Sequence, residues 1–434
     1  MWSTSFTRLA ALLGLIAAGL GSAFAQEKVK VGMVMPLTGT LASAGKQVTA
    51  GARLYLHQHG TRVAGKEIEL MVKDDTSSFE VGKRLIQEAI VNDRVDIVGG
   101  GLTGDLFASA ALLTEARKPT VIMLSSTSAV IDKSPYFVRT SCTLAQSSVI
   151  MADWAMNAGL KRIVTVVSDF SPGHEAEAVF KDRYLAAGGQ IVELIRVPLQ
   201  NPDFAPFLQR ARDAAPQALF VFIPSVQAAT FAKQFVERGL DKAGIKLIGP
   251  GDLADDDLLP HMGDAILGTV TAHFYSAAHP SALNNSFVEG YRKQNNSRAN
   301  FMAVSGYDGM HLIYQALQNT RGATDSSQLI AAMRGAAWES PRGPMSIDPI
   351  TGEYGVTVRF QPHVHVKDTV DFCPGNLGGR PAAHVDLLRR ELALIDHHHR
   401  VVFPRNRWKH AAIVQVHGSR FRVQGSGSST NGEP

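Results

Sequence analysis

Apolar residues along the chain follow two recurring patterns. Short runs of consecutive apolar residues, such as 29–35 and 218–223, have the length of strands that are buried on both faces. Longer stretches, such as 45–59, carry apolar residues every three or four positions and predict helices with one buried face. Because runs and stretches alternate, we expect strand–helix units wound into parallel sheets, which is an α/β fold.

The alternation occurs in two successive series. In the first series, strands are predicted at 29–35, 68–73, 95–98 and 120–124. In the second series, strands are predicted at 163–168, 191–197, 218–223, near 247 and at 268–274. Helical periodicity then returns at 283–294, 307–317 and 327–334. Two such series predict two Rossmann-like lobes, and 434 residues are enough to give each lobe its own core.

The N-terminus has the pattern of a secretory signal peptide. Arg8 precedes an apolar run at 9–20, and the small-residue sequence AFA at 23–25 predicts cleavage before Gln26. The run is shorter than the roughly 20 residues that cross a bilayer. We therefore expect the mature chain to work outside the inner membrane, in a periplasm.

The low cysteine content indicates a fold that is stabilised by its hydrophobic core and not by disulfides. An oxidising compartment permits disulfides, but Cys142 and Cys373 are the only cysteines of the chain. Two cysteines are no disulfide framework, and the sequence leaves open whether they pair.

The net charge of +4 comes from the C-terminal part of the chain. Residues 353–434 hold eleven Lys or Arg against seven Asp or Glu, so residues 1–352 carry 32 of each sign. A neutral body offers no electrostatic footprint for nucleic acid. The C-terminal part also holds eight of the 15 His, including 397–399, and ends in GSGSSTNGEP. Three adjacent imidazoles cannot all face one ion, so we expect a poorly ordered tail without a metal site.

The sequence VGGGLTGD at 98–105 contains the G-x-G-x-x-G spacing that holds a dinucleotide pyrophosphate in many enzymes. A dinucleotide site places its glycines after the first strand and an acidic residue at the end of the next strand. Here the glycines follow the third strand, and the next strand ends in SSTS at 125–128, with no carboxylate before Asp132. We therefore expect no NAD or FAD, and no cofactor of another kind.

The same loop has the properties of an anion site. Its small residues let backbone N–H groups approach a ligand, a helix beginning near Gly104 offers an electropositive end, and Thr103 adds a hydroxyl donor. The serines at 125–128 follow the neighbouring strand, at the edge where open α/β sheets bind ligands. This pattern predicts a crevice for a carboxylate or another small anion, although serines of either loop alone also serve as turn caps.

Catalytic motifs are incomplete. His174-Glu175 starts an H-E-x-x-H pattern, but Ala178 stands where the second His belongs, and the chain has neither G-x-S-x-G nor G-K-[ST]. The acidic triplet at 255–257 is open to two interpretations, a site for a hard cation or the first turn of a helix, and the second is favoured. The sequence therefore favours a protein that is not an enzyme.

Five stretches together resemble the type I periplasmic binding proteins of the branched-chain amino acid class, the leucine/isoleucine/valine-binding family. They are VKVGMVMPLTGTLASAGKQVTAGARL at 29–54, the strand IVGGG at 97–101, FVRT at 137–140, YDGMHLIYQAL at 307–317 and GPMSID at 343–348. The similarity covers about residues 27–352 and rests on the ordered set of stretches.

The resemblance implies two Rossmann-like lobes joined by a three-segment hinge, with crossings near Thr140, Ala272 and Trp338. The lobes close on a small-molecule ligand, which is handed to an inner-membrane ABC permease. The expected organisation is a signal peptide at 1–25, a first lobe from 26–140 and 275–338, a second lobe from 141–274 and 339–360, and an Arg/His-rich tail at 361–434.

The resemblance also implies where the ligand binds. Thr103 falls where the family holds the ligand carboxylate with a Ser hydroxyl, and the loop at 125–127 matches the second loop, which grips carboxylate and amino groups. The loops at 169–173, 225–226 and 251–252 match those of the second lobe that close over the ligand. The expected ligand-binding residues are Thr103, Ser125, Ser126, Thr127, Phe170, Ser171, Ser225 and Asp252.

Departures from the family pattern bear on the ligand. Amino-acid binders place a glutamate after Gly-Pro to pair with the ligand ammonium, whereas this chain reads GPGD at 249–252. Positions that hold aromatic walls in the family carry small residues here, namely Ala44, Pro172 or Ser171, and Ser225 or Val226. Small residues at these positions leave room for an aromatic or longer-chain carboxylate. An amino acid would bury its ammonium group without a partner, at a cost of several kcal/mol. An amino acid remains an alternative if Asp252 takes the place of the glutamate.

Two further points stay open in the sequence. Family members end soon after the GPMSID-like stretch, whereas this chain continues to residue 434, which we interpret as a reading-frame artefact or a divergent extension. A ligand-sensing receptor of the same fold is an alternative to a transport protein. A secreted hydrolase is less favoured, because it needs a nucleophile with its base.

Overall fold

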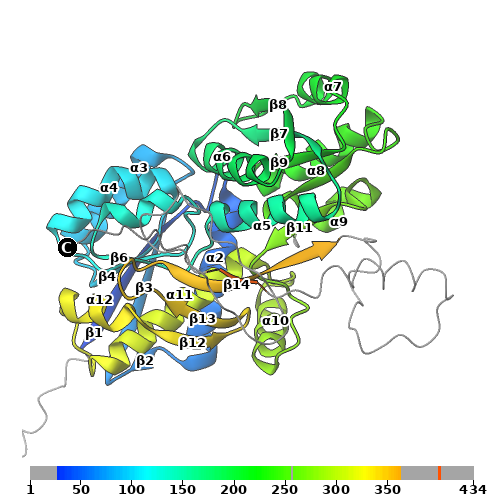
Figure 1. Ribbon diagram of the computed structural model, residues 1–434. Coiled ribbons are helices and arrows are strands. Elements are labelled where there is room, and N and C mark those ends of the chain that lie inside the picture. Colours follow the sequence, from blue (N-terminus) through cyan, green and yellow to red (C-terminus); the bar gives the residue numbers. More distant parts are fainter. Residues whose placement is uncertain (1–26, 256–257, 363–398, 402–434) are drawn as a thin grey trace, which may run out of the picture. The chain divides into compact units, whose positions relative to one another are not determined.

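A computed structural model describes residues 27–255, 258–362 and 399–401, and they form two sheets with helices packed around them (Figure 1). The first sheet has six strands in the order β2-β3-β1-β4-β5-β6. The second has nine strands, of which eight follow the order β12-β13-β14-β11-β10-β9-β7-β8, while β15 pairs with β14. Both sheets lie within one structural unit that extends to Val401.

The first sheet is parallel apart from its short edge strand β2, which pairs with β3 in the antiparallel sense. Its strands are β1 (Lys28–Met35), β2 (Arg62–Val63), β3 (Lys66–Asp74), β4 (Ile97–Gly100), β5 (Thr120–Ile122) and β6 (Phe137–Arg139). The connecting helices are α2 (Ala42–His59), α3 (Phe79–Val91), α4 (Thr103–Glu115) and the 3₁₀ helix η1 (Ser128–Lys133). The continuous apolar runs of β1 and β4 are buried, as expected for strands covered on both faces.

The second sheet combines a parallel part with an antiparallel part. The parallel strands are β7 (Arg162–Ser168), β8 (Gln190–Val197), β9 (Ala218–Phe222), β10 (Lys246–Pro250) and β11 (Val270–His273). The antiparallel strands are β12 (Ala337–Ser340), β13 (Gly343–Ile347), β14 (Tyr354–Pro362) and β15 (His399–Val401). The helices of this series are α5 (Leu144–Asn157), α6 (Ser171–Ala186), α7 (Ala205–Asp213), α8 (Ser225–Glu237), α9 (Leu259–Met262) and the 3₁₀ turns η2 (Gly251–Ala254) and η3 (Gly263–Ile266).

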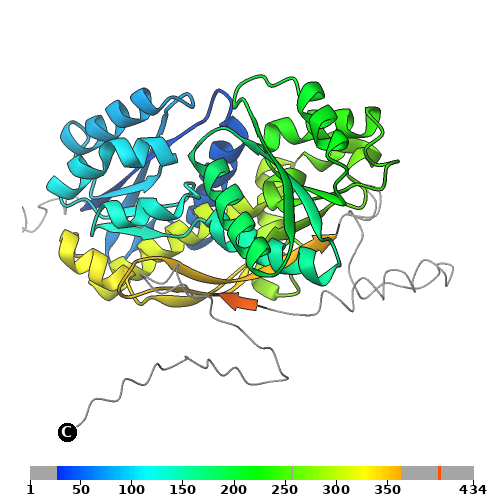
Figure 2. The ribbon, with the colours of Figure 1, turned by 45° about the horizontal axis from the view of Figure 1, so that its top comes forward.

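Three helices from late in the chain return to the first series. They are α10 (Ala282–Asn295), α11 (Phe301–Asn319) and α12 (Ser326–Met333), and α11 lies beside α2 (Figures 1 and 2). The two helices touch through their backbones, because a Cβ at Gly51 would stand 1.8 Å from the carbonyl oxygen of Ala303. A Cβ at Gly306 would likewise stand 2.0 Å from the carbonyl oxygen of Val48. A side chain at either glycine would separate the two helices.

The predicted α/β fold is confirmed, and each strand predicted in the two series is present with shifted ends. The lobe boundaries near 140, 274 and 338 remain our proposal. The expected signal peptide at 1–25, Cys373 and His397 lie outside the described residues, while Cys142 is a buried free cysteine. Within the expected tail at 361–434, residues 361–362 and 399–401 belong to strands, and the rest lies outside the described residues.

Candidate functional site

Loops at the carboxyl ends of strands in both sheets line a cavity of about 240 Å³. Open α/β sheets bind ligands at this edge. Seven of the eight residues expected at the site line the cavity, and these are Thr103, Ser125, Ser126, Phe170, Ser171, Ser225 and Asp252. Thr127 does not line it, but its hydroxyl oxygen lies 3.3 Å from that of Thr103. The two loops singled out in the first series therefore meet.

One end of the cavity is suited to an anion. Thr103 is the first residue of α4, and its Oγ1 lies 2.7 Å from the Oγ of Ser125. The first backbone N–H groups of an α-helix have no partner within the helix, and the N-cap residue Leu102 makes no side-chain cap hydrogen bond to those of α4. Thr103 and Gly104 both line the cavity, which places the positive end of α4 beside two hydroxyl groups.

Gly100 and Gly101, which precede α4, have φ angles of +86° and +85°. Residues other than glycine rarely adopt this backbone conformation. Gly101, the second glycine of the G-x-G-x-x-G pattern, and its neighbour Gly100 therefore turn the chain from β4 into α4.

Arg139 holds the second ligand loop from behind. Its guanidinium is fully buried and donates to the carbonyl oxygen of Ser125 and, at 2.8 Å, to that of Thr127. The Oγ of Ser141 also donates to the Ser125 carbonyl, at 2.6 Å. A salt bridge of 2.9 Å from Nε to the carboxylate of Glu353 balances the buried charge. This arginine belongs to the motif FVRT, whose sequence alone does not indicate the function.

Apolar side chains form most of the cavity wall. Phe170 and Phe222 stack with ring centroids 6.0 Å apart and an interplanar angle of 13°. Other large apolar residues on the wall are Leu41, Phe79, Leu102, Phe107, Leu124 and Met302. The positions at which small residues were expected in place of aromatic walls, Ala44, Ser171 or Pro172, and Ser225 or Val226, line the same cavity. The wall therefore combines large apolar side chains with small residues.

Sequence reasoning missed several of these wall residues. Phe107 lies four positions after Thr103 on α4, so helical periodicity could have placed both side chains on the same face. Phe222 ends β9 at the strand edge that binds ligands. Met302, in contrast, comes from the first turn of α11, and no local pattern connects it with the site.

Among the described residues that line the cavity, Asp252 is the one with a charged side chain. It lies in η2, directly after β10, and burial raises its pKa to about 7. Within the part of the chain that the structure describes, no other side chain pairs with this carboxyl. The predicted GPGD turn therefore brings an acidic group to the cavity.

Glu175 connects the two series beside the cavity. It lies on α6, and both of its carboxylate oxygens accept from the backbone N–H of Ser128, each at 3.1 Å. Burial raises its pKa, while the hydrogen bonds from Ser128 and the charge of Arg139 act in the opposite direction. The glutamate of the partial H-E-x-x-H pattern thus binds the first turn of η1.

A family model described as periplasmic binding protein matches residues 28–361. The chain belongs to the periplasmic binding protein family. A curated relative from Brucella suis biovar 1 (strain 1330), Leu/Ile/Val-binding protein homolog 6, is 40% identical over 333 residues, which are 76% of this chain and 85% of the relative. The resemblance found in the sequence is confirmed.

Two solved structures of solute-binding proteins of ABC transporters are similar over 77% of this chain and 93% of their own, each with a TM-score of 0.75. The first, from Rhodopseudomonas palustris BisB5, is 55% identical and was solved in complex with 3,4-dihydroxybenzoic acid. The second, from R. palustris, is 35% identical and was solved in complex with 4-hydroxybenzoate. Both carry the fold expected for this binding protein.

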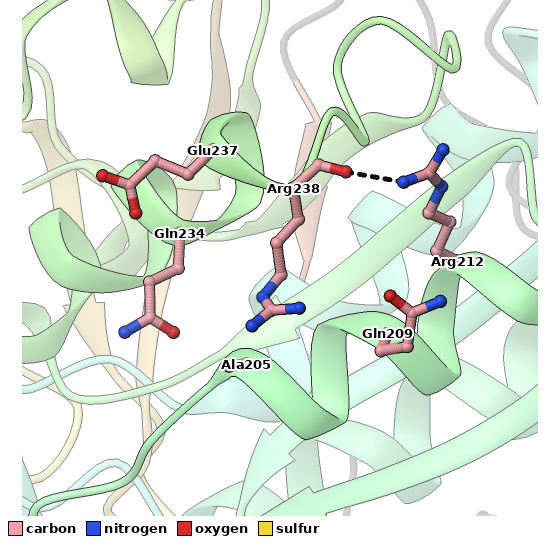
Figure 3. A pocket seen from close by; sticks show the side chains of 6 residues that line it. All are labelled: Ala205, Gln209, Arg212, Gln234, Glu237 and Arg238. Atoms are coloured by element: carbon pink, nitrogen blue, oxygen red, sulfur yellow. Dashed lines mark hydrogen bonds between the residues drawn. The ribbon is translucent and has the colours of Figure 1, made fainter.

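The binding protein has a second, polar pocket of about 550 Å³ between α7 and α8 (Figure 3). Arg212 donates to the carbonyl oxygen of Arg238 at 2.9 Å, and Gln209, Gln234 and Glu237 complete its polar lining. Seven of the eight residues expected to bind the ligand line the other cavity.

The described residues hold no group of three or more His, Cys, Asp or Glu that could bind a metal ion, and no helix among them could span a membrane. The interpretation of the acidic triplet as a helical first turn was wrong for Asp255, because α9 begins only at Leu259. Asp255 instead accepts from the side-chain amide of Asn300 at 2.7 Å. Residues 256–257 lie outside the described part.

Two buried carboxyl groups, those of Asp75 and Asp105, lie close enough to interact electrostatically at the start of α4. Burial raises the pKa of Asp75 to about 6 and, together with the charge of Asp75, that of Asp105 to about 8. The folded protein therefore binds more protons than the unfolded chain between about pH 4 and pH 8. The stabilisation is complete below the ordinary aspartate pKa, is lost progressively as the pH rises above about 4, and is gone above about pH 8.

Asp105→Asn is therefore expected to flatten the pH dependence of stability. An amide keeps the side-chain volume and can donate to Asp75, but it cannot ionise. Urea unfolding between about pH 5 and pH 8 should show a free energy of unfolding that falls less for the variant than for the wild type. The exposed Asp182→Asn should leave the wild-type slope unchanged. Equal slopes for wild type and Asp105→Asn would show that the pair does not share a proton.

Proposed function

We propose that this chain is the solute-binding component of an ABC importer and that it binds an aromatic carboxylate of the benzoate class. The observation that carries the proposal is the combination of an anion-binding end at Thr103 with aromatic walls in one small cavity. A volume of about 240 Å³ lies just below the roughly 300 to 1,000 Å³ typical of sites for drug-sized ligands, and therefore suits a small solute.

The relatives support this ligand class. The solved protein with 55% identity binds 3,4-dihydroxybenzoic acid, and the one with 35% identity binds 4-hydroxybenzoate. The ligand carboxylate would lie at the start of α4, and the ring would contact Phe170 and Phe222. The proposed partner is an inner-membrane ABC permease, and the proposed location is the periplasm.

A branched-chain amino acid is the second candidate, because the curated relative is named for leucine, isoleucine and valine binding. In that case Asp252 would pair with the ligand ammonium. Isothermal titration calorimetry of the mature protein with benzoate, 4-hydroxybenzoate and L-leucine distinguishes the two candidates. Binding of leucine alone would refute the aromatic proposal.

Thr103→Ala is expected to weaken binding of 4-hydroxybenzoate by about ten- to a hundredfold. A hydrogen bond to a charged group contributes roughly 1.5 to 3 kcal/mol, and each 1.4 kcal/mol is a factor of ten in affinity. Thr103→Ser keeps the hydroxyl and is the matched control, so it should bind within a few-fold of the wild type. If calorimetry shows that Thr103→Ala binds 4-hydroxybenzoate as tightly as the wild type, the ligand carboxylate does not bind at this end of the cavity.

A further inference from the structure

We propose that Asp252 recognises a hydroxyl group on the ligand ring and thereby makes the protein selective for hydroxylated benzoates. This inference rests on the proposed function and names the residue that determines selectivity within it. The other hydrogen-bonding groups that the described residues bring to the cavity belong to hydroxyl-bearing residues and the backbone, while the remaining side chains of this lining are apolar or small.

The two polar parts of the cavity come from different sheets. Thr103 and Ser125 follow β4 and β5 of the first sheet, whereas Asp252 follows β10 of the second. A ligand held by its carboxylate at the first part therefore meets Asp252 with another of its atoms. A ring with a second polar substituent can engage both.

The carboxyl of Asp252 differs from other acidic groups near the cavity. Glu175 accepts from the backbone of Ser128, and Glu353 pairs with Arg139. The carboxylate of Asp252 accepts from its own backbone N–H, but no described side chain donates to it, and its desolvation favours a further hydrogen-bonded partner. A ligand group that enters the cavity can supply this partner.

A phenolic hydroxyl is the chemistry that fits best. It donates to the carboxylate when Asp252 is ionised and accepts from the carboxyl when Asp252 is protonated. With a pKa of about 7, both forms are present near neutral pH. A ligand with a second carboxylate at this position would meet a like charge, so the site should reject benzene dicarboxylates.

The test is a calorimetric comparison of benzoate, 4-hydroxybenzoate and 3,4-dihydroxybenzoate with the wild type and with Asp252→Ala. We expect the wild type to prefer at least one hydroxylated ligand over benzoate. Asp252→Ala should weaken binding of that ligand by about ten- to a hundredfold and leave benzoate binding unchanged or tighter, because a hydrogen bond to a charged group is lost. The exposed Asp264→Asn, also from a turn of the second series, is the control and should retain the wild-type preference.

Each other outcome has a separate meaning. Wild-type protein that binds none of the three aromatic acids overturns the proposed function. Wild-type binding that Asp252→Ala weakens equally for benzoate and the hydroxylated ligands overturns the inference alone, since Asp252 then supports the cavity wall. Leucine binding that Asp252→Ala abolishes assigns the carboxylate to an ammonium group and overturns both. Asp252→Asn provides a second variant should the alanine variant fail to fold, which circular dichroism would show.

Discussion

Asp308→Ala is expected to lower the free energy of unfolding by about 3 to 5 kcal/mol, the loss found when one partner of a buried ion pair is removed. Asp308 and Arg342 are both fully buried, and the Nε of Arg342 donates to the Asp308 carboxylate at 2.7 Å. The same carboxylate accepts from Ser340 at 2.8 Å and from the indole of Trp338 at 3.1 Å. The variant would leave a buried guanidinium without its counter-ion.

The expected loss is large because Arg342 also organises other segments. It donates to the carbonyl oxygen of Thr140 at 2.7 Å, and its guanidinium lies 4.9 Å from the ring centroid of Phe274. The three segments that the sequence resemblance places at lobe crossings thus come close to one arginine. Disturbing it should therefore destabilise all three segments together.

Urea unfolding followed by circular dichroism measures the effect, with the exposed Asp213→Asn as a control that should shift stability by less than about 0.5 kcal/mol. The double variant Asp308→Leu with Arg342→Met removes both charges and should recover a large part of the loss. If Asp308→Ala lowers the free energy of unfolding by less than about 1 kcal/mol, water or rearranged polar groups must compensate the charge of Arg342.

Periodicity predicted the elements with a clear buried face and missed those without one. Helix α5 has no such stripe, because residues all around it are buried, from Leu144 to Ala155. Its start could have been recognised, since Thr143 and Gln146 form a capping box. Strand β6 has only three residues, too few for any periodic signal. The antiparallel pairing of β14 depends on partners distant in the sequence, which local patterns do not encode.

The residues that line the site were easier to predict from the sequence than the residues that hold them in place. Strand ends followed by small polar residues identified Thr103 and Ser125, because function in parallel sheets concentrates at that edge. Arg139 belongs to β6, and its partner Glu353 lies more than 200 positions away in the sequence. Only the folded chain brings the two side chains together, so no local pattern indicates the pair. Met302 reaches the cavity for the same reason.

Arg139→Met is expected to reduce both stability and ligand affinity, through two separable causes. Stability should fall by about 3 to 5 kcal/mol, because Glu353 loses the cation that balances its buried charge. Affinity for 4-hydroxybenzoate should fall by roughly tenfold or more. The carbonyl groups of Ser125 and Thr127 lose their charged donor, and the loop no longer holds its hydroxyl groups beside Thr103.

The double variant Arg139→Met with Glu353→Gln separates the two causes. It removes the unpaired carboxylate, so the free energy of unfolding should recover in part. The loop remains without its arginine, and the affinity should stay low in calorimetry. If affinity returns together with stability, the arginine acts on the fold as a whole and has no specific effect on the ligand loop. If affinity alone stays low, Arg139 is a positioning residue for Ser125, acting from behind the cavity wall.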